Sequence, residues 1–428
     1  MTHRQSPGPS GALSCARAWL RKARVFLAGV GLLVGASAAA APSSSCAEQL
    51  LRELGWTLQY ADIDTPQVTP GQPCTRASLA EAQAAGDLHA VLPADPQRAA
   101  VALQALFDEP ATVCAYAFRL GDAARRASER LAGNPDFRFT GLQTGWIGFG
   151  SAGPQVQGWE RFRSFGRGYQ PLAANSLALD AFYRGHVRAE CGVGRQVAQL
   201  ATQRELYGDA GFDSVFSAGE LSIGTFVTLH DTDSVLLGHH AGEFLADGKA
   251  VRTAALGRQA FMAVPGFIEH AFSKRFLDDL SNQAENFIVV DVSDDAARAL
   301  ASHGGLAYYD RVNRRLWELS QQVQAPGRRG FERLLYERDP TALKHLDANE
   351  RAVLAQMQAL LDDPFYRGFI VYVHPRGVRP IGYHIARLLD RNPRTPFTIA
   401  LALHNLHTTL YRRWIDYRLA QCAGETNR

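Results

Sequence analysis

The chain has 428 residues, of which 46% are hydrophobic and 20% are charged, with 38 glycines and 20 prolines. This is an ordinary globular composition, and it excludes a disordered, fibrous or multi-span membrane protein. The formal charge of +3 is concentrated in the first 41 residues, which carry five basic side chains and no acidic one. The remainder has 40 basic and 42 acidic side chains, so it lacks the basic footprint of a nucleic-acid-binding protein. We therefore expect proteins or small molecules as partners, and no nucleic acid.

Residues 1–41 have the pattern of a secretory signal peptide. The basic residues end at Arg24, an apolar run follows at Val25–Gly35, and small residues occupy Ala36–Ala41. The apolar run is short for a bilayer core of about 30 Å. We expect export to the periplasm or the exterior, and no membrane span after cleavage within Ala38–Ala41. An uncleaved anchor helix, or a lipoprotein signal ending at Cys46, are the alternatives.

In the oxidising compartment that export implies, cysteines can form disulfides. Cys15 leaves with the signal segment, and five cysteines remain: Cys46, Cys74, Cys114, Cys191 and Cys422. Because the number is odd, at least one thiol has no partner within the chain. We expect the four flanking cysteines to supply the disulfides and Cys191 to stay a free thiol.

The hydrophobic pattern predicts three regions after the signal segment. Residues 42–135 are expected to be a helical N-terminal region, with helices at Ala47–Tyr60, Pro96–Phe107 and Val113–Leu131. Residues 136–325 are expected to form the core, in which a helix at Ala189–Leu206 precedes strands at Leu221–Leu229, Gln259–Val264, Asn286–Val292 and Gly305–Asp310.

A polar segment, Gln321–Gly330, is expected to link the core to a helical C-terminal region at 326–428. Helices are predicted there at Arg351–Leu361, after a capping box of Asp347 and Glu350, and at Phe397–Ala420.

Cys191 is the candidate nucleophile in the core. It stands at the start of a predicted helix, where unpaired backbone N–H groups and the helix dipole favour a thiolate. Gly192 and Gly194 follow it, and each costs a helix about 1 kcal/mol. Their presence favours a close approach of a substrate to the backbone of the first turn. The alternative is a buried structural cysteine or one half of a disulfide.

Several segments resemble, in order, a small bacterial enzyme family, the spore-coat type of protein-glutamine gamma-glutamyltransferase. The similarity covers about residues 140–320. The segments are Ser176–Gly185, Ala189–Gly194 with its Glu-Cys pair, Gly238-His239-His240, Leu256–Pro265, Ala284-Glu285-Asn286 and Ser302-His303-Gly304. The chain differs from the family at Ala284, where glycine is usual, and at Arg258, where an acidic residue is usual.

The resemblance implies an α+β fold with a papain-like (NlpC/P60-like) cysteine-enzyme core at 136–325. It implies that Cys191 is the nucleophile, Glu285 the general base, Glu190 a partial substitute for that base and His303 a neighbour of the site. The activity it implies is a transglutaminase that joins glutamine side chains to lysine or other primary amines of proteins. No metal or organic cofactor is implied.

Glu285 can act as the general base only in an environment that raises the pKa of its carboxyl group. With a thiol pKa of about 8.5 and a carboxyl pKa of about 4.3, transfer of the proton from the sulfur to the carboxylate is unfavourable by roughly 6 kcal/mol. Burial of Glu285 can raise its pKa and reduce this difference. The assignment therefore requires a closed, apolar site around Cys191 and Glu285.

Two other functions remain open from the sequence. One is a cysteine peptidase or amidase of the cell envelope, with His303 as base and water as acceptor. The other is a non-enzymatic envelope scaffold, in which Cys191 would be exposed or disulfide-bonded. Two histidine clusters, His239-His240 with Glu243 and His404-x-x-His407, have spacings compatible with a metal but supply no convincing set of three ligands, so no metal site is expected.

Overall fold

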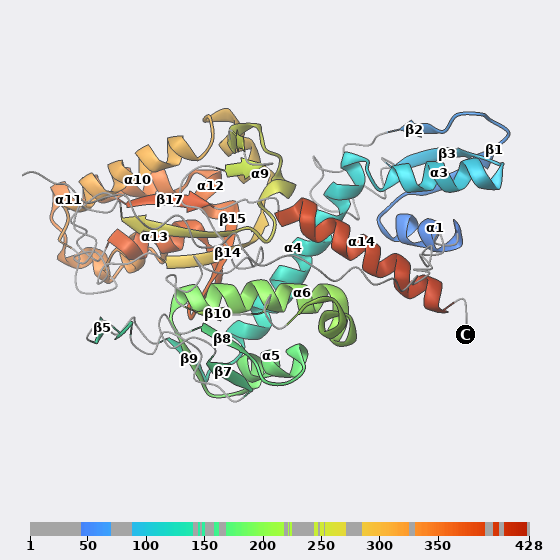
Figure 1. The fold of residues 1–428 in the computed structure, drawn as a ribbon. Coiled ribbons are helices and arrows are strands. Elements are labelled where there is room, and N and C mark those ends of the chain that lie inside the picture. Colours follow the sequence, from blue (N-terminus) through green and yellow to red (C-terminus); the bar gives the residue numbers. More distant parts are fainter. Residues whose placement is uncertain are drawn as a thin grey trace, which may run out of the picture. The chain divides into compact units, whose positions relative to one another are not determined.

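The computed structural model describes residues 44–69, 88–139, 144–145, 148–149, 158–161, 168–217, 221, 223–224, 244–246, 249–251, 253–270, 285–324, 330–389, 397–401 and 406–425. These residues form a mixed α+β fold of helices and several small sheets (Figure 1), as the sequence predicts at that level. The expected signal segment, residues 1–41, lies outside the described residues.

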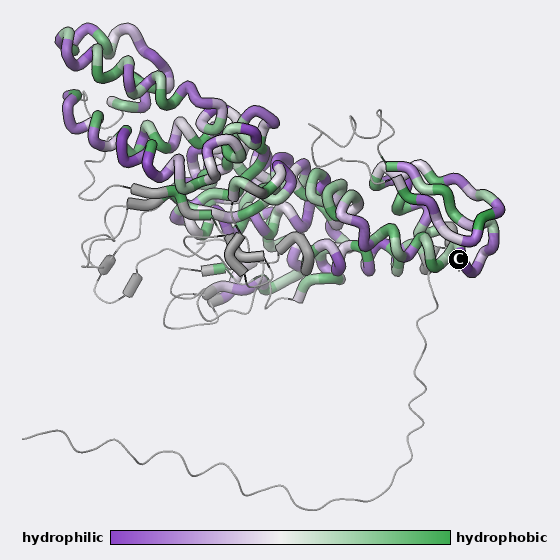
Figure 2. Tube along the Cα trace, turned by 90° about the horizontal axis from the view of Figure 1, so that it is seen from above, coloured by the Kyte–Doolittle hydropathy of each residue, from purple (hydrophilic) through white to green (hydrophobic). Residues whose placement is uncertain are grey.

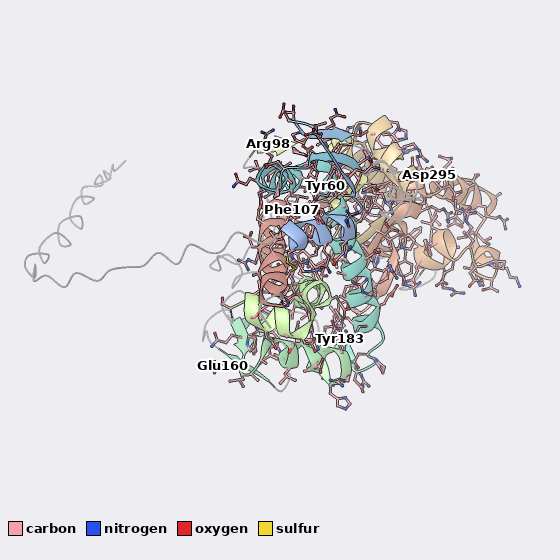
Figure 3. All side chains as sticks on the ribbon, turned by 90° about the vertical axis from the view of Figure 1, so that its right-hand side faces the viewer. Tyr60, Arg98, Phe107, Glu160, Tyr183 and Asp295 are labelled. Atoms are coloured by element: carbon pink, nitrogen blue, oxygen red, sulfur yellow. A yellow bond between two sulfur atoms is a disulfide. The ribbon has the colours of Figure 1, made fainter. Side chains whose placement is uncertain are left out.

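The N-terminal part is a small sheet with two helices, not a purely helical region. Its elements are α1 (Ser44–Glu53), β1 (Thr57–Ala61), β2 (Gln67–Thr69), β3 (His89–Pro93) and α3 (Pro96–Leu106). The strand order is β1-β3-β2, with β1 parallel and β2 antiparallel to β3. The helix predicted over Ala47–Tyr60 is wrong in its second half, because Gly55 takes a left-handed φ of 99° and ends the helix before β1. In Figure 3, Tyr60 of β1 and Phe107 after α3 mark this part of the chain.

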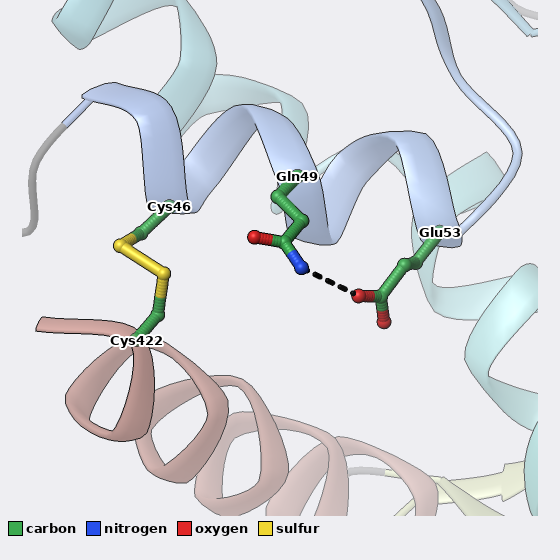
Figure 4. The surroundings of a disulfide bond; sticks show 4 residues. All are labelled: Cys46, Gln49, Glu53 and Cys422. Atoms are coloured by element: carbon green, nitrogen blue, oxygen red, sulfur yellow. Dashed lines mark hydrogen bonds between the residues drawn. A yellow bond between two sulfur atoms is a disulfide. The ribbon is translucent and has the colours of Figure 1, made fainter. Parts of the chain in front are cut away.

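A disulfide ties the first described helix to the last. Cys46 of α1 is bonded to Cys422 of α14 (Leu406–Glu425), 376 residues further along the chain (Figure 4). Arg418 of α14 also pairs with Glu53 at the other end of α1, at 2.7 Å. The two helices are therefore held together at both ends of α1.

The cysteine expectation is confirmed for the cysteines that the structure describes. Cys114 is disulfide-bonded, as the Cys46 and Cys422 pair is, and Cys191 is a free thiol. Cys74 lies outside the described residues.

Three helices form the middle of the molecule: α4 (Pro110–Ala132), α5 (Asn175–Arg184) and α6 (Cys191–Val215). Both α4 and α5 pack against α6. The guanidinium of Arg130 on α4 lies 4.0 Å from the ring centroid of Tyr183 on α5, which is labelled in Figure 3. The short strands of the described residues form three pairs and one triplet. The pairs are β4 (Phe137–Phe139) with β9 (Val187–Ala189), β5 (Thr144–Gly145) with β6 (Gly148–Phe149), and β11 (Phe244–Ala246) with β12 (Lys249–Val251). The triplet is β7 (Trp159–Arg161), β8 (Gly168–Pro171) and β10 (Ile223–Gly224).

The largest sheet has five strands, all paired antiparallel, in the order β16-β15-β14-β13-β17. The strands are β13 (Pro265–His270), β14 (Glu285–Val292), β15 (Phe369–Val373), β16 (Gly377–Pro380) and β17 (Phe397–Leu401). Three of them come from 326–428, which the sequence suggested was a separate helical region. That boundary cuts through the sheet, so residues 326–428 belong to the same core.

The central strand β14 is buried on both of its faces. Ile288 and Val290 belong to the hydrophobic cluster that contains residues of α4 and α6. Phe287 and Val289 belong to the cluster that contains residues of α9 (Asp294–Ser302), α10 (Leu306–Ser320) and α13 (Ile381–Leu389). Successive strand residues point to opposite faces, so odd-numbered and even-numbered positions at the start of β14 meet different helices.

The remaining described elements lie on the side of the sheet where α9, α10 and α13 pack. They are η3 (Thr253–Ala255), η4 (Arg258–Phe261), the π-helix η5 (Glu332–Tyr336), η6 (Ala342–His345), α11 (Ala348–Leu361) and α12 (Pro364–Gly368). The predicted capping box of Asp347 and Glu350 is present at the start of α11.

Two predicted strands of the core are wrong, and so is the start of the helix predicted over Phe397–Ala420 in the C-terminal region. Gly305–Asp310 opens a helix, because its buried residues continue with helical spacing to the end of α10. Gln259–Val264 contains the 3₁₀ turn η4, and the strand begins at Pro265. Phe397–Leu401 is the edge strand β17, and α14 begins at Leu406.

Hydrophilic and hydrophobic residues are interleaved along the described helices (Figure 2). Among the residues that the structure describes, no helix combines the length and apolar character needed to cross a membrane.

We expect the disulfide between α1 and α14 to be a main source of stability for the N-terminal part. Cys422→Ser should lower the free energy of unfolding by about 2–5 kcal/mol, because the link restrains the unfolded chain over a very long loop. Urea denaturation followed by circular dichroism measures this. Cys46→Ser should cost a similar amount, and the double variant should cost no more than either single variant, since both break the same bond. A double variant that loses the sum of the two would contradict this.

Candidate active site at the start of α6

The first turn of α6 is capped by a carboxylate. Glu190 is the N-cap, and its Oε1 accepts a hydrogen bond from the Val193 backbone N–H at 2.8 Å. Its Oε2 accepts one from the Gly192 N–H at 2.6 Å. The two N–H groups that the sequence suggested for stabilising a thiolate at Cys191 are therefore bound to Glu190.

The Cys191 thiol lies between this carboxylate and an amide. The thiol is partly buried and hydrogen-bonds the Glu190 carboxylate. On its other side, the Asn286 Nδ2 donates to Cys191 Sγ at 3.4 Å. Asn286 is the second residue of β14 and shares the face of Ile288 and Val290 against which α6 packs.

The thiol is held in its protonated form in this arrangement. Burial, together with the charges of Glu190 and, less strongly, Glu285, raises the pKa of Cys191 to about 12, against the lowering effect of hydrogen bonds from Asn286. Burial also raises the pKa of Glu190, against the lowering effect of the hydrogen bonds from Gly192, Val193 and Cys191. The sequence-based expectation of a thiolate stabilised by the helix terminus is not met in this state, because the helix terminus serves Glu190.

A buried guanidinium lies one turn further along α6. Arg195 is 1% exposed, and its Nη1 donates to Gln199 Oε1 at 3.1 Å. Burial lowers the pKa of Arg195 to about 10, while the nearby Glu190 and Cys191 raise it. Arg195 is thus the positive charge available to a Cys191 thiolate from within the helix.

Glu285, the expected base, makes its hydrogen bonds on the face of the sheet that is opposite to Cys191. It is 5% exposed, and it shares the face of Phe287 and Val289. Its Oε2 lies 2.7 Å from His384 Nδ1, and its Oε1 accepts from Arg387 Nη1 at 2.7 Å. The side chain that β14 presents to the thiol is Asn286.

His303 lies at the end of α9. Its ring stacks on Tyr308 with centroids 4.2 Å apart, and its Nε2 lies 3.5 Å from Asp363 Oδ2. The side chain is 38% exposed. Its contacts among the described residues are with α10 and the start of α12, so the structure does not bring His303 to Cys191.

A different imidazole packs against the first turns of α6. His374 follows β15 and is 2% exposed, with its ring stacked on Phe137 at 3.8 Å. A Cβ at Gly194 would lie 2.2 Å from His374 Cβ, so only glycine fits there. The sequence suggested that a substrate approaches this turn, whereas in the structure the space beside Gly194 is occupied by His374. Burial lowers the pKa of His374 to about 4, so the ring is neutral at pH 7.

Three of these residues, Asn286, Arg195 and His374, were not predicted from the sequence. The Glu-Asn pair carried a signal for Asn286, since adjacent strand residues face opposite sides and only one of the two can face a given helix. Arg195 is four residues after Cys191, which places both on one helix face. Nothing local marked His374, which joins the site through the sheet.

The histidine clusters weighed as metal ligands receive no support. His239, His240, Glu243 and His404 lie outside the described residues, and the side chain of His407 is not described. Within the described ranges, no group of three His, Cys, Asp or Glu residues is placed to hold a metal ion.

Comparisons of the chain with protein-family models, with curated proteins and with solved structures gave no match. A functional interpretation therefore depends on the geometry around Cys191.

We expect Glu190→Gln to increase the reactivity of Cys191 toward iodoacetamide. The thiolate is the reacting form, and removing the adjacent negative charge lowers the thiol pKa. Below that pKa the thiolate fraction rises about tenfold per pH unit, so the rate profile of the variant should shift to lower pH. Alkylation measured by intact mass between pH 7 and 10 tests this, with Cys191→Ser as the blank. Slower alkylation in the variant would show that Glu190 assists rather than opposes ionisation.

Proposed function

We propose that this chain is an exported acyltransferase of the transglutaminase type, which forms a thioester on Cys191 and transfers the acyl group to a primary amine. The observation that carries the proposal is the reduced Cys191 thiol at the start of α6, between the Glu190 carboxylate and the Asn286 amide. The nucleophile helix packs on an antiparallel sheet, an arrangement in keeping with a papain-like core. The resemblance of the Glu-Cys and Glu-Asn segments to bacterial transglutaminases supports the choice of reaction.

The reaction has two half-reactions. The Cys191 sulfur attacks the carbonyl carbon of a glutamine side chain, the bond from that carbon to nitrogen breaks, and ammonia leaves with the thiol proton. A lysine amine then attacks the thioester carbon, the carbon–sulfur bond breaks, and the proton lost by the amine returns to the sulfur. No electrons are exchanged, and no metal or organic cofactor takes part.

Glu190 is the proton carrier in this proposal, because its carboxylate contacts the thiol. It accepts the thiol proton, gives it to ammonia, and later accepts a proton from the incoming amine. The two titrations are coupled, since protonating Glu190 removes a charge that raises the thiol pKa. Arg195 then faces a thiolate and a neutral acid, so its positive charge stabilises the thiolate.

Asn286 supplies hydrogen-bond stabilisation where charge develops. An amide N–H placed 3.4 Å from the sulfur is close to the carbon that the sulfur attacks. It can therefore donate to the oxygen of the tetrahedral intermediate, which becomes negative at that point.

The other two functions have weaker support. A peptidase or amidase that uses His303 needs that imidazole at the thiol, whereas His303 pairs with Asp363. A scaffold with a vestigial core predicted an exposed or disulfide-bonded Cys191, whereas the thiol is free and partly buried. Export is supported by the disulfides, which persist in oxidising compartments.

The test is incorporation of a fluorescent primary amine into a glutamine-rich protein by the mature chain. Cys191→Ala should abolish it. Glu190→Gln should lower kcat by about 100-fold to 10,000-fold, because a glutamine cannot accept the thiol proton. The same variant is expected to alkylate faster, so the two measurements separate reactivity of the thiol from turnover.

Asn286→Ala should lower kcat by about 100-fold to 1,000-fold with little change in KM, because the lost hydrogen bond acts in the transition state. His303→Ala serves as the matched control, as an imidazole in the same half of the molecule that does not contact the site. No incorporation by the wild-type chain, or loss on His303→Ala with retention in Glu190→Gln, would refute the proposal.

A further inference from the structure

Glu285 is held by two side chains of one helix. His384 and Arg387 lie three residues apart on α13 and bond to separate oxygens of the Glu285 carboxylate, each at 2.7 Å. All three side chains are buried: Glu285 is 5% exposed, His384 0% and Arg387 8%. A buried carboxylate needs such partners, and removing one of them leaves an uncompensated charge.

This cluster fixes the start of β14 against α13. Glu285 is the first residue of the strand, whereas Tyr383, the neighbour of His384 on α13, donates to Glu332 of η5 at 2.8 Å. The His384 and Arg387 contacts therefore define where the strand end lies on this face of the sheet.

Asn286 is the next residue and faces the other way. Because side chains alternate along a strand, the face that Glu285 occupies determines the face that Asn286 occupies. A slip of one residue would direct Glu285 toward α6 and Asn286 toward α13. The ionic contacts of Glu285 disfavour that slip, since a neutral amide cannot replace the carboxylate between His384 and Arg387.

We propose that the cluster of Glu285, His384 and Arg387 is a positioning device, which acts across the sheet to hold the Asn286 amide at the Cys191 sulfur. Glu285 is in this view a positioning residue and not the proton acceptor of the thiol. The role of this cluster in catalysis rests on the proposed function, whereas its effect on the reactivity of the Cys191 thiol does not.

The sign of one effect separates the two roles of Glu285. Removing its charge alone should make alkylation of Cys191 faster, because that negative charge disfavours the thiolate. Losing the position of Asn286 should make alkylation slower, because the amide hydrogen bond favours the thiolate. Glu285→Gln should therefore slow iodoacetamide alkylation of the full mature chain, by about threefold or more, in spite of the lost charge.

The same substitution is then made in an Asn286→Ala background. Since the amide is absent there, the slowing should disappear and alkylation should be equal or faster. Arg387→Lys is the second variant: it keeps the charge but cannot reproduce the guanidinium geometry, and it should slow alkylation only when Asn286 is present. It carries the test should Glu285→Gln fail to fold.

Tyr383→Phe is the matched control, since it removes a buried hydrogen bond from the same helix without touching β14. It should leave alkylation unchanged. Faster alkylation in Glu285→Gln in both backgrounds, equal slowing in both backgrounds, or slowing by Tyr383→Phe would each overturn the proposal.

Failure of this proposal is distinguishable from failure of the proposed function. Alkylation needs no substrate, so coupling between Glu285 and Asn286 with no amine incorporation by the wild type would refute only the transglutaminase activity. Amine incorporation without that coupling would refute only the positioning device.

Discussion

The alternation of side chains along β14 is the constraint on which the candidate site depends. The strand lies in the middle of a five-stranded antiparallel sheet and is buried on both faces. Its apolar residues enter two hydrophobic clusters, one shared with α4 and α6 and the other with α9, α10 and α13. Because both faces are packed, a change of register would move every side chain into the wrong environment. The strand therefore links the region of Cys191 to the charged cluster on α13.

The electrostatics of the site depend on which group accepts the backbone hydrogen bonds at the start of α6. Glu190 takes the backbone donors of the first turn, so the helix dipole stabilises a carboxylate and not a thiolate. The thiol is kept protonated by burial and by that adjacent charge. In the proposed reaction the same contact becomes useful, because one proton transfer neutralises Glu190 and leaves Arg195 as the uncompensated charge near the sulfur. A protonated resting thiol also resists oxidation in the compartment where the other described cysteines form disulfides.

Local signals in the sequence were sufficient for elements whose ends are marked by their own residues. The helix α11 begins at the capping box of Asp347 and Glu350 that the sequence predicts. Signals failed where a short apolar run fits either a helix or a strand. Leu306 and Tyr309 were assigned to a strand, yet their burial continues with helical spacing through α10. The edge strand β17 was assigned to a helix, because its pairing with β13 is a contact between distant parts of the chain.

The sequence by itself determined that the chain is an α+β protein, that Cys191 begins a helix, and that this cysteine stays reduced while others pair. The fold class was implied by the family resemblance, and the helix by the spacing of apolar residues. The odd number of cysteines required at least one unpaired thiol, and the nucleophile role that the resemblance implies assigned that thiol to Cys191. Only the tertiary structure decided which polar groups meet the sulfur. Glu285 and Asn286 are adjacent and both polar, and the face each one occupies depends on how β14 pairs with β13 and β15 and on the side chains that α13 presents. Those contacts join residues far apart in the chain, so no local pattern contains them.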